Sequence, residues 1–404
     1  MKRLFRLGLV VLSVVGLSFC PGARRAVVAR GSFATSAKPV TVPFVFDNNR
    51  VFVELTFTLP DGTTRKTLAF VDTGNPDFDL SKSLIDALHI ERGKNLNVRL
   101  GDFPLEIDSD VRAEGFDAPS MLPGMQVEAN LPAKVLRHYI LVLDYGKRTL
   151  TLAQPGALKL EGTRVPFQLN AKTGLVAVEA TVDGRVYSMA IDNGSAYTWI
   201  SQNAVNQWTQ KHPDWQRGHG AVGSANMNGS FAELSGVDLR LPALALGSLQ
   251  LADIGALGIS SGWDPKAPPL FDWYSQKTPG PVVAFLGGNV LKAFRLTIDY
   301  AEGASYWLRQ QPDDAHDLDQ VGVTLSATQD GKYSVLQVAE QNGQKSVTGV
   351  QPGDILVSVD GLPVTGATQG KVVAALHGIP GDTRVLHLQR NGKEFTVTAK
   401  VARF

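Results

Sequence analysis

Residues Leu68-Ala69-Phe70-Val71-Asp72-Thr73-Gly74 form an apolar run that ends in an Asp-x-Gly triplet. A second apolar run, residues 187–191, ends in Asp192-Asn193-Gly194. Each run follows a strand-like segment and a turn that contains glycine, which together are typical of a β-hairpin. The two stretches therefore read as two copies of one unit, and a repeat of this kind decides the fold.

Both copies have the same order of expected elements. The first hairpin comprises strands over 51–58 and 68–71 around Pro60-Asp61-Gly62, and a helix is expected over 84–88. In the second copy the strands are expected over 175–182 and 187–191 around Asp183-Gly184, with a helix over 204–208.

The repeat continues on both sides of the triplets. Val42-Pro43-Phe44 recurs as Val165-Pro166-Phe167, and residues 129–145 align without gaps with residues 284–300. Both aligned segments end in Asp-Tyr, before a turn and a final strand. Because three matching blocks occur in the same order, we expect two copies of one β-rich fold, over residues 41–154 and 164–309.

The second copy is longer than the first. Its additional residues lie at 209–230 and at 260–281. The second of these stretches is rich in proline, glycine and tryptophan, so we expect a surface loop there.

These motifs resemble a known family. An apolar–apolar–Asp-Thr-Gly sequence at the end of a strand resembles the signature of aspartic peptidases. Phe285-Leu286-Gly287, followed by an expected helix over 289–294, is similar to the second signature of that family. The closing strands, 141–145 and 296–300, are similar to those of bacterial retropepsin-like domains. The resemblance implies a mainly β protein with two retropepsin-like β-barrel lobes arranged as a pepsin-like pseudo-dimer.

The same resemblance implies a reaction. In aspartic peptidases a water molecule lies between two carboxyl groups, and two like charges this close cannot both ionise easily, so one keeps a proton. The chain carries two Asp-x-Gly triplets, so it can supply both carboxyls itself. Asp72 and Asp192 are therefore the expected catalytic pair of an aspartic endopeptidase that hydrolyses peptides or unfolded protein without a cofactor.

Residues beside the pair have expected supporting roles. The Thr73 hydroxyl would brace the two loops against each other, and Gly74 and Gly194 would let backbone amides approach the carboxyls. Ser195 is expected to hydrogen-bond Asp192 and favour its ionisation. Three features depart from the family pattern, namely Asn193 in place of Thr or Ser, Asn75-Pro76 after the first triplet, and Pro132 in place of the second-signature glycine.

A flap over the substrate is also expected. In the second copy the candidate is the glycine-rich segment 218–229, and in the first copy it lies within 95–120. Ordinary mobile loops are the alternative for both segments.

Residues 319–404 form a separate expected domain after the polar linker 312–317. Strands are expected over 321–325 and 333–338, and residues 350–356 lead into Val359-Asp360-Gly361. A helix is expected over 371–376 and a hairpin around Asn391-Gly392. The sequence GVQPGDILVSVDGLPV, residues 349–364, resembles bacterial PDZ domains, which implies a small α+β domain that adds an extended peptide to a sheet edge. A C-terminal peptide ligand would lie at the loop Val321, Gly322, Val323, Thr324 and Leu325. The alternative is a small β-domain that packs on the lobes without binding a peptide.

The composition excludes several other classes. The 404 residues carry a formal net charge of +1, because 39 Lys and Arg balance 38 Asp and Glu, so nucleic acid is not an expected partner. The only cysteine is Cys20, which excludes an internal disulfide and a cysteine-based zinc site. The seven histidines are scattered, so no metal site is expected.

The N-terminus is typical of an export signal. Basic residues precede the apolar run 7–19, which is short for a membrane span, and Cys20-Pro21-Gly22 offers a small-x-small cleavage site. We expect a signal peptide over 1–22 and a linker over 23–40, which predicts an exported protein of the periplasm or cell envelope. An uncleaved anchor, a lipoprotein that tethers the chain to the membrane, and a disordered tail are alternatives.

Two other motif matches lack the structural context that their chemistry needs. Residues 218–223 match a dinucleotide-binding pattern, and residues 258–262 match the nucleophile elbow of serine hydrolases. Neither is followed by a sequence that can enter a helix. Besides the endopeptidase, two hypotheses stay open, namely a peptide-binding or scaffold protein that kept the fold without catalysis, and an enzyme in which two chains pair their second copies.

Overall fold

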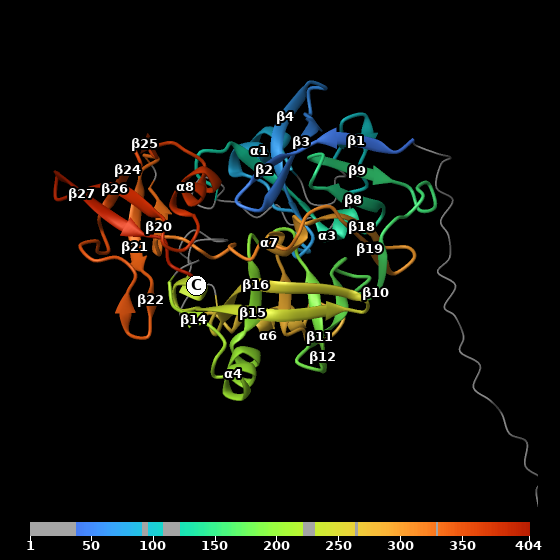
Figure 1. The fold of residues 1–404 in the computed structure, drawn as a ribbon. Coiled ribbons are helices and arrows are strands. Elements are labelled where there is room, and N and C mark those ends of the chain that lie inside the picture. The colour runs from blue at the N-terminus through green and yellow to red at the C-terminus, as the bar shows by residue number, and fades with distance from the viewer. Residues whose placement is uncertain (1–37, 91–95, 108–121, 221–230, 263–265, 329) are drawn as a thin grey trace, which may run out of the picture. The chain divides into compact units, whose positions relative to one another are not determined.

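The computed structural model describes residues 38–90, 96–107, 122–220, 231–262, 266–328 and 330–404. These residues belong to one compact unit. The expected signal peptide and most of the linker over 23–40 lie outside the described residues. With 46% of residues in strands and 13% in helices, the protein is mainly β, as predicted (Figure 1).

The first copy forms a six-stranded sheet around the predicted hairpin. Strands β3 and β4 pair antiparallel, and β4 pairs parallel with β7, so that Asp72 lies opposite Pro132. Helix α1, Lys82–Leu88, is capped by the Ser81 side chain, which accepts a hydrogen bond from the Leu84 amide. The strands of this sheet are β2 (Val45–Asp47), β3 (Arg50–Thr58), β4 (Thr64–Asp72), β5 (Val98–Leu100), β6 (Phe103–Pro104) and β7 (Val127–Pro132).

The second copy repeats this arrangement. Strands β11 and β12 form the hairpin, and β12 pairs parallel with β17, so that Ile191 lies opposite Leu286. Helix α4, Gln202–Lys211, covers the predicted helix and extends it at both ends. The strands are β11 (Val176–Val182), β12 (Arg185–Ile191), β13 (Thr198–Ser201), β14 (Arg217–Gly218), β15 (Val237–Leu246), β16 (Leu249–Ile259) and β17 (Ala284–Leu286).

The two copies meet in an antiparallel arrangement of their closing strands. Strands β8 and β18 are direct neighbours, with Val142 opposite Thr297. In the strand order β1-β9-β8-β18-β19-β10, equivalent strands of the two copies occupy matching positions on either side of this central pair. The aligned segments of the sequence repeat therefore lie side by side in space. The six strands are β1 (Val40–Pro43), β8 (Ile140–Asp144), β9 (Thr149–Ala153), β10 (Thr163–Leu169), β18 (Phe294–Asp299) and β19 (Ala304–Arg309).

Short helices follow the strands of the second signature in each copy. Helix α3, Ala133–Leu136, follows β7, and α7, Gly288–Leu291, follows β17. The expected helix over 289–294 was too long, because the chain is already in β18 at Phe294. A further short helix, α5, spans Phe231–Leu234.

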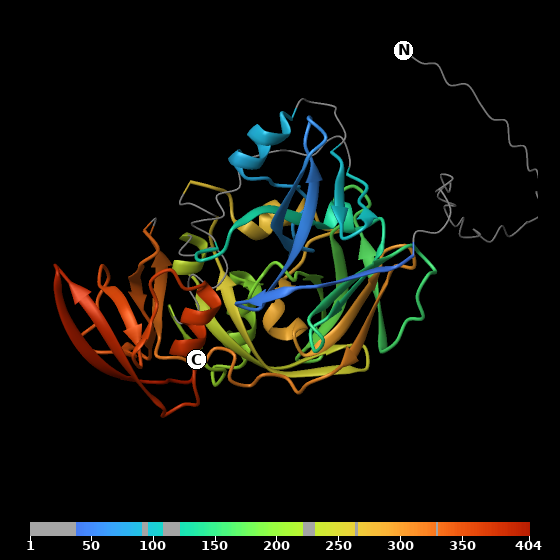
Figure 2. The ribbon, with the colours of Figure 1, turned by 90° about the horizontal axis from the view of Figure 1, so that it is seen from above.

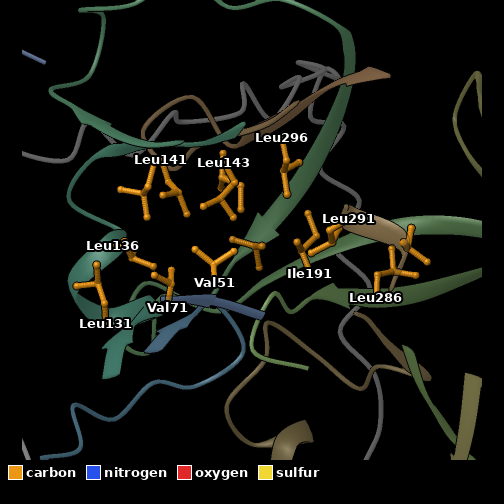
Figure 3. Packing of buried hydrophobic residues seen from close by; sticks show 14 of the residues in the cluster. Val51, Val71, Leu131, Leu136, Leu141, Leu143, Ile191, Leu286, Leu291 and Leu296 are labelled. Carbon is orange, nitrogen blue, oxygen red and sulfur yellow. The ribbon is translucent and has the colours of Figure 1, made fainter. Parts of the chain in front are cut away.

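The hydrophobic core lies behind the two Asp-x-Gly loops. Val71 and Ile191, which precede the two aspartates, are buried in one cluster with Leu131 and Leu286 of the second-signature strands. Figure 3 shows these side chains below the leucines of β8 and β18. Burial of a leucine or isoleucine side chain contributes about 1.5–3 kcal/mol, so this shared core holds both loops at one place.

The expected surface loop over 260–281 is wrong for residues 270–275. Residues 270–275 form helix α6, Leu270–Ser275, and Leu270, Phe271 and Tyr274 are buried there. The aromatic rings pack on Phe285 of β17, with the Tyr274 and Phe285 centroids 4.4 Å apart. The proline and glycine residues of this stretch lie before and after the helix, so they mark its ends and do not interrupt it.

The C-terminal residues form a sheet of their own, shown at the red end of the chain in Figures 1 and 2. Strand β20 lies at one edge of the order β20-β21-β24-β26-β27, and helix α8, Gln369–Leu376, covers the predicted helix. Asn391 and Gly392 both have positive φ in the tight turn between β26 and β27, as their sequence predicted. The strands of this sheet are β20 (Val323–Ala327), β21 (Tyr333–Val338), β24 (Ile355–Val359), β25 (Leu362–Pro363), β26 (Thr383–Arg390) and β27 (Lys393–Lys400), and β22 (Glu340–Gln341) and β23 (Gln344–Lys345) form a separate pair.

Within the described part of the chain, no helix has the length and apolar character needed to cross a membrane.

Candidate active site

The two Asp-x-Gly loops hold each other through a reciprocal set of four hydrogen bonds. The Thr73 amide donates to Asn193 Oδ1 over 2.9 Å, and the Asn193 amide donates to Thr73 Oγ1 over 3.0 Å. The Thr73 hydroxyl donates to the Ile191 carbonyl over 3.1 Å, and Asn193 Nδ2 donates to the Val71 carbonyl over 3.0 Å. The structure thus places the Thr73 hydroxyl across the loops as expected, and it gives Asn193 the equivalent position in the other copy.

The replacement of Thr or Ser by Asn193 therefore leaves the cross-loop bonding complete. An asparagine side chain has an amide oxygen that accepts and an NH2 group that donates. Asn193 therefore both accepts from and donates to the backbone of the first loop, as a threonine or serine hydroxyl could. Thr73 and Asn193 are both buried, at 1% and 0% exposure, where an unmade hydrogen bond would be costly.

Each loop glycine lies against the aspartate of the other loop. A Cβ atom added to Gly74 would lie 2.2 Å from Asp192 Cγ, and one added to Gly194 would lie 2.2 Å from Asp72 Oδ1. Neither distance can accommodate a side chain. Glycine is therefore required at both positions so that each carboxyl can lie against the opposite backbone.

The two carboxyl groups lie in the space between the loops, close enough for each to influence the ionisation of the other. Burial raises the pKa of Asp72 well above its usual range, and the neighbouring Asp192 carboxyl raises it further. Burial also raises the pKa of Asp192, to about 6, although hydrogen bonds from the Ser195 and Gly194 amides oppose the shift. A carboxyl pair of this kind holds one shared proton over a wide pH range.

The two aspartates differ in their backbone donors. Asp192 Oδ1 accepts hydrogen bonds from the Gly194 amide at 2.9 Å and from the Ser195 amide at 3.2 Å. Asp72 Oδ1 accepts one from the Gly74 amide at 3.0 Å. Donors to a carboxylate favour its charged form, so this difference favours the charge on Asp192 and the proton on Asp72.

The predicted role of the Ser195 side chain is wrong. Its hydroxyl donates to the Tyr197 carbonyl over 2.7 Å, and the group that reaches Asp192 is its backbone amide. A hydroxyl finds a carbonyl two residues along the chain more easily than a carboxyl across a turn. Ser195 still contributes to the ionisation of Asp192, through its backbone.

Pro132 leaves the equivalent contact of the first copy in place. The Ala133 amide donates to the Asn75 carbonyl over 2.9 Å, just as the Gly288 amide donates to the Ser195 carbonyl over 2.7 Å. Proline lacks an N–H group, but the donor in each copy belongs to the following residue. The departures at Asn75 and Pro132 therefore keep the link between each loop and its second-signature strand.

Asparagines behind the loops are site residues that the sequence motifs did not indicate. In the first copy, Asn130 Oδ1 accepts from the Asp79 amide, and its Nδ2 donates to the Asp77 carbonyl. In the second copy, Asn289 Oδ1 accepts from both the amide and the hydroxyl of Thr198. Both asparagines are buried. Nothing in the sequence indicated a role for these two asparagines, because their hydrogen-bond partners lie 51 and 91 residues away.

Tyr274 of helix α6 interacts electrostatically with both carboxyls of the pair. Burial raises the pKa of Tyr274 well above its usual range, and the nearby Asp192 and Asp72 carboxyls add to the shift. A neutral phenol is therefore the form present beside the carboxyl pair.

The expected flaps fall mostly outside the described residues. Of the candidate over 218–229, only residues 218–220 are described, and of the candidate over 95–120, residues 96–107. The latter include the short strands β5 and β6, which pair with each other.

The loop expected to hold a peptide carboxylate is buried. Val321, Val323, Thr324 and Leu325 have exposures between 0% and 7%, and the Thr324 hydroxyl donates to the Gly220 carbonyl. A Cβ atom on Gly322 would lie 2.3 Å from Ser346 Oγ. In this arrangement, β20 is the edge strand of its sheet, while side chains of its loop pack against the protein itself.

Comparison with known protein families and with curated proteins found no match to this chain. Among the residues that the structure describes, no group of three or more His, Cys, Asp or Glu side chains is arranged to hold a metal ion. The interpretation of the site therefore depends on its own geometry.

Proposed function

We propose that the protein is an aspartic endopeptidase that hydrolyses peptide bonds with a water molecule activated between Asp72 and Asp192. The observation that carries this proposal is the meeting of the two carboxyls above a reciprocal hydrogen-bonded base made by Thr73 and Asn193. Both aspartates come from one chain, which supports a pseudo-dimer formed within the chain over pairing between two chains.

The chemistry follows from the shared proton. The ionised carboxylate takes a proton from the water as its oxygen attacks the carbonyl carbon of the peptide. The protonated carboxyl gives its proton to the carbonyl oxygen, so a neutral tetrahedral intermediate forms. The carboxyl that took the water proton then gives it to the leaving nitrogen as the C–N bond breaks. A hydroxyl of the intermediate gives its proton to the other carboxylate as the C=O bond forms, so the pair returns to its one-proton state.

The backbone donors suggest which carboxyl starts in which state. Asp192 accepts two amide hydrogen bonds and would be the ionised partner, whereas Asp72 would be the protonated one. The pair titrates as a unit, so a kinetic profile reports two values that belong to the pair. Because the pKa of Asp192 is raised to about 6, the active form with one shared proton is populated at pH values above about 6.

The substrate would be an extended peptide or an unfolded protein segment. The C-terminal sheet supports a PDZ-like role through its edge strand β20 and helix α8. Because residues 321–325 are buried, such a peptide would have to displace the contact between Thr324 and Gly220. An exported protein with an N-terminal signal or tether would meet such substrates in the cell envelope.

Cleavage of a denatured protein, followed by mass spectrometry of the new termini, tests the proposal. The wild-type chain is expected to cleave, and Asp72→Asn and Asp192→Asn are each expected to abolish cleavage while retaining peptide binding. The rate per chain should not change on dilution, because both acids lie in one chain. Binding without cleavage by the folded wild type from pH 3 to 8 would instead identify a scaffold protein.

A further inference from the structure

The loop that carries Asp192 is supported from behind by one asparagine. Asn289 in helix α7 accepts from the Thr198 amide at 2.9 Å and from the Thr198 hydroxyl at 3.1 Å. The Thr198 hydroxyl in turn accepts from the Gly287 amide at 3.1 Å. Backbone bonds from Asn289 to Ala196 and from Gly288 to Ser195 complete the support. The position of Asn289 therefore fixes residues 195–198, directly after Asp192.

The linker aspartate Asp317 fixes Asn289 from the other side. Asn289 Nδ2 donates to Asp317 Oδ2 over 2.7 Å and to the Gly255 carbonyl over 2.8 Å. The same Asp317 oxygen accepts from the Gly255 amide over 2.9 Å. Since Nδ2 points to these two acceptors, Oδ1 is oriented toward Thr198. The carboxylate of Asp317 thereby decides which way the Asn289 amide faces.

Asp317 is buried with a charged partner. Its side chain is 3% exposed, and Arg240 NH1 lies 3.2 Å from its Oδ1. Arg240 also contacts Asp319 Oδ1 at 3.2 Å and the backbone oxygen of Phe404 at 2.8 Å. The guanidinium of Arg240 therefore joins strand β15, the linker and the C-terminal segment. The linker was expected to be a polar connection, yet it carries a buried charge at this junction.

The described residues of the first copy contain no counterpart of this arrangement. In the gapless alignment of the repeat, Lys134 stands where the second copy has Asn289. The first loop is supported by Asn130 on strand β7, from within its own lobe. Among the residues that the structure describes, the support from outside the repeat is thus found at the Asp192 loop.

We propose that Asp317 is a positioning residue for Asp192, which acts through Asn289 and couples the docking of the C-terminal segment to the geometry of the carboxyl pair. The inference rests on the proposed endopeptidase function for its kinetic consequence. The hydrogen-bond relay itself is a property of the fold and can be measured without any substrate.

The test compares Asp317→Asn with the matched control Asp313→Asn. Asp313 is an acid of the same linker that also accepts from a backbone amide of β16, that of Ala252, and pairs with an arginine, Arg309. It does not reach Asn289 in the structure. Asp317→Asn is expected to lower kcat about 10- to 100-fold with KM within about twofold, because misplaced reacting groups cost rates of this order. Asp313→Asn is expected to retain the wild-type kcat.

Amide hydrogen exchange in the full-length protein gives a readout that needs no activity. Asp317→Asn is expected to speed exchange at Thr198, Gly287 and Gly288, and Asp313→Asn is expected to leave it unchanged. Equal exchange at these amides in the two variants would overturn the relay even if the enzyme cleaves peptides. Faster exchange in a protein whose wild type cleaves nothing would retain the relay and refute the proposed function.

A double-mutant cycle separates a relay from general loosening. If Asp317 acts only through Asn289, the variant D317N/N289A should be no worse in kcat than N289A alone. Multiplicative losses would show that Asp317 acts by another route. Should Asp317→Asn not fold, Asn289→Ala with its Asp317–Arg240 pair intact tests the same step, and unchanged exchange at Gly287 and Thr198 would contradict it.

Discussion

Asp192→Asn is expected to stabilise the folded protein at neutral pH while it removes activity. Asparagine keeps an oxygen that can accept from the Gly194 and Ser195 amides, and its NH2 group can donate to Asp72. The change therefore removes a buried acid and preserves its hydrogen bonds. A site built to hold two acids together stores strain that this variant releases.

The magnitude follows from the pKa of Asp192, which burial raises from 3.8 to about 6. A difference of about 2 pKa units corresponds to roughly 3 kcal/mol at 1.36 kcal/mol per unit. Because the folded-state pKa is the higher one, the stability that Asp192 contributes is fully present below pH 3.8 and is lost as the pH rises through 6. The variant has no such titration, so its advantage grows from near zero at pH 4 to about 3 kcal/mol at pH 8.

Urea unfolding of the wild type and Asp192→Asn at pH 4, 6 and 8 measures this difference. Asp102→Asn, at a fully exposed side chain, is the control and should change the free energy of unfolding by less than about 0.5 kcal/mol at each pH. A constant difference between Asp192→Asn and the wild type from pH 4 to 8 would refute the reasoning, because it would mean that Asp192 titrates alike in both states.

Three further changes address the contacts around the pair. Asn193→Ala should lower the free energy of unfolding, measured by chemical denaturation, by about 2–4 kcal/mol, because it leaves the buried Thr73 amide and the Val71 carbonyl without partners. Asn193→Thr is the control, and an equally large loss in that variant would argue against this bonding. Gly194→Ala should abolish hydrolysis in a folded protein, because its Cβ would occupy the position of the Asp72 carboxyl, and near-normal rates would contradict the packing of the loops. Arg240→Met should destabilise the protein by about 3–5 kcal/mol at neutral pH, because it leaves the buried linker residue Asp317 without its cation and removes one of the cations that pair with buried Asp319; thermal unfolding that matches the wild type would contradict this pairing.

The hairpins and the repeat could be predicted because their signals are local. Alternating apolar residues specify the strands, and turns such as Asp183-Gly184 need positive φ at both positions, which the structure shows. The aligned segments 129–145 and 284–300 predicted equivalent strands, and β8 and β18 now lie beside each other. Local chemistry thus determined the elements and the places of both aspartates.

The predictions that failed depend on partners far along the chain. Asn193 looked like a departure because nothing near it shows that its amide would reach the backbone 120 residues earlier. Asp317 read as part of a polar linker, yet its partners Asn289 and Arg240 lie 28 and 77 residues away. The prediction for the Ser195 hydroxyl failed for the opposite reason, because the nearby Tyr197 carbonyl accepts its hydrogen bond instead of Asp192. Side-chain composition alone does not rank such competing partners.

The central claim is that Asp72 and Asp192 share one proton, and carbon-13 NMR titration of their labelled carboxyl groups tests it most directly. The account predicts two coupled steps, one near pH 6 and one well above the usual range of an aspartate, with the Asp72 step moving lower when Asp192 is changed to asparagine. Two independent titrations near pH 4 would contradict it, because separate acids of that kind could not hold a shared proton.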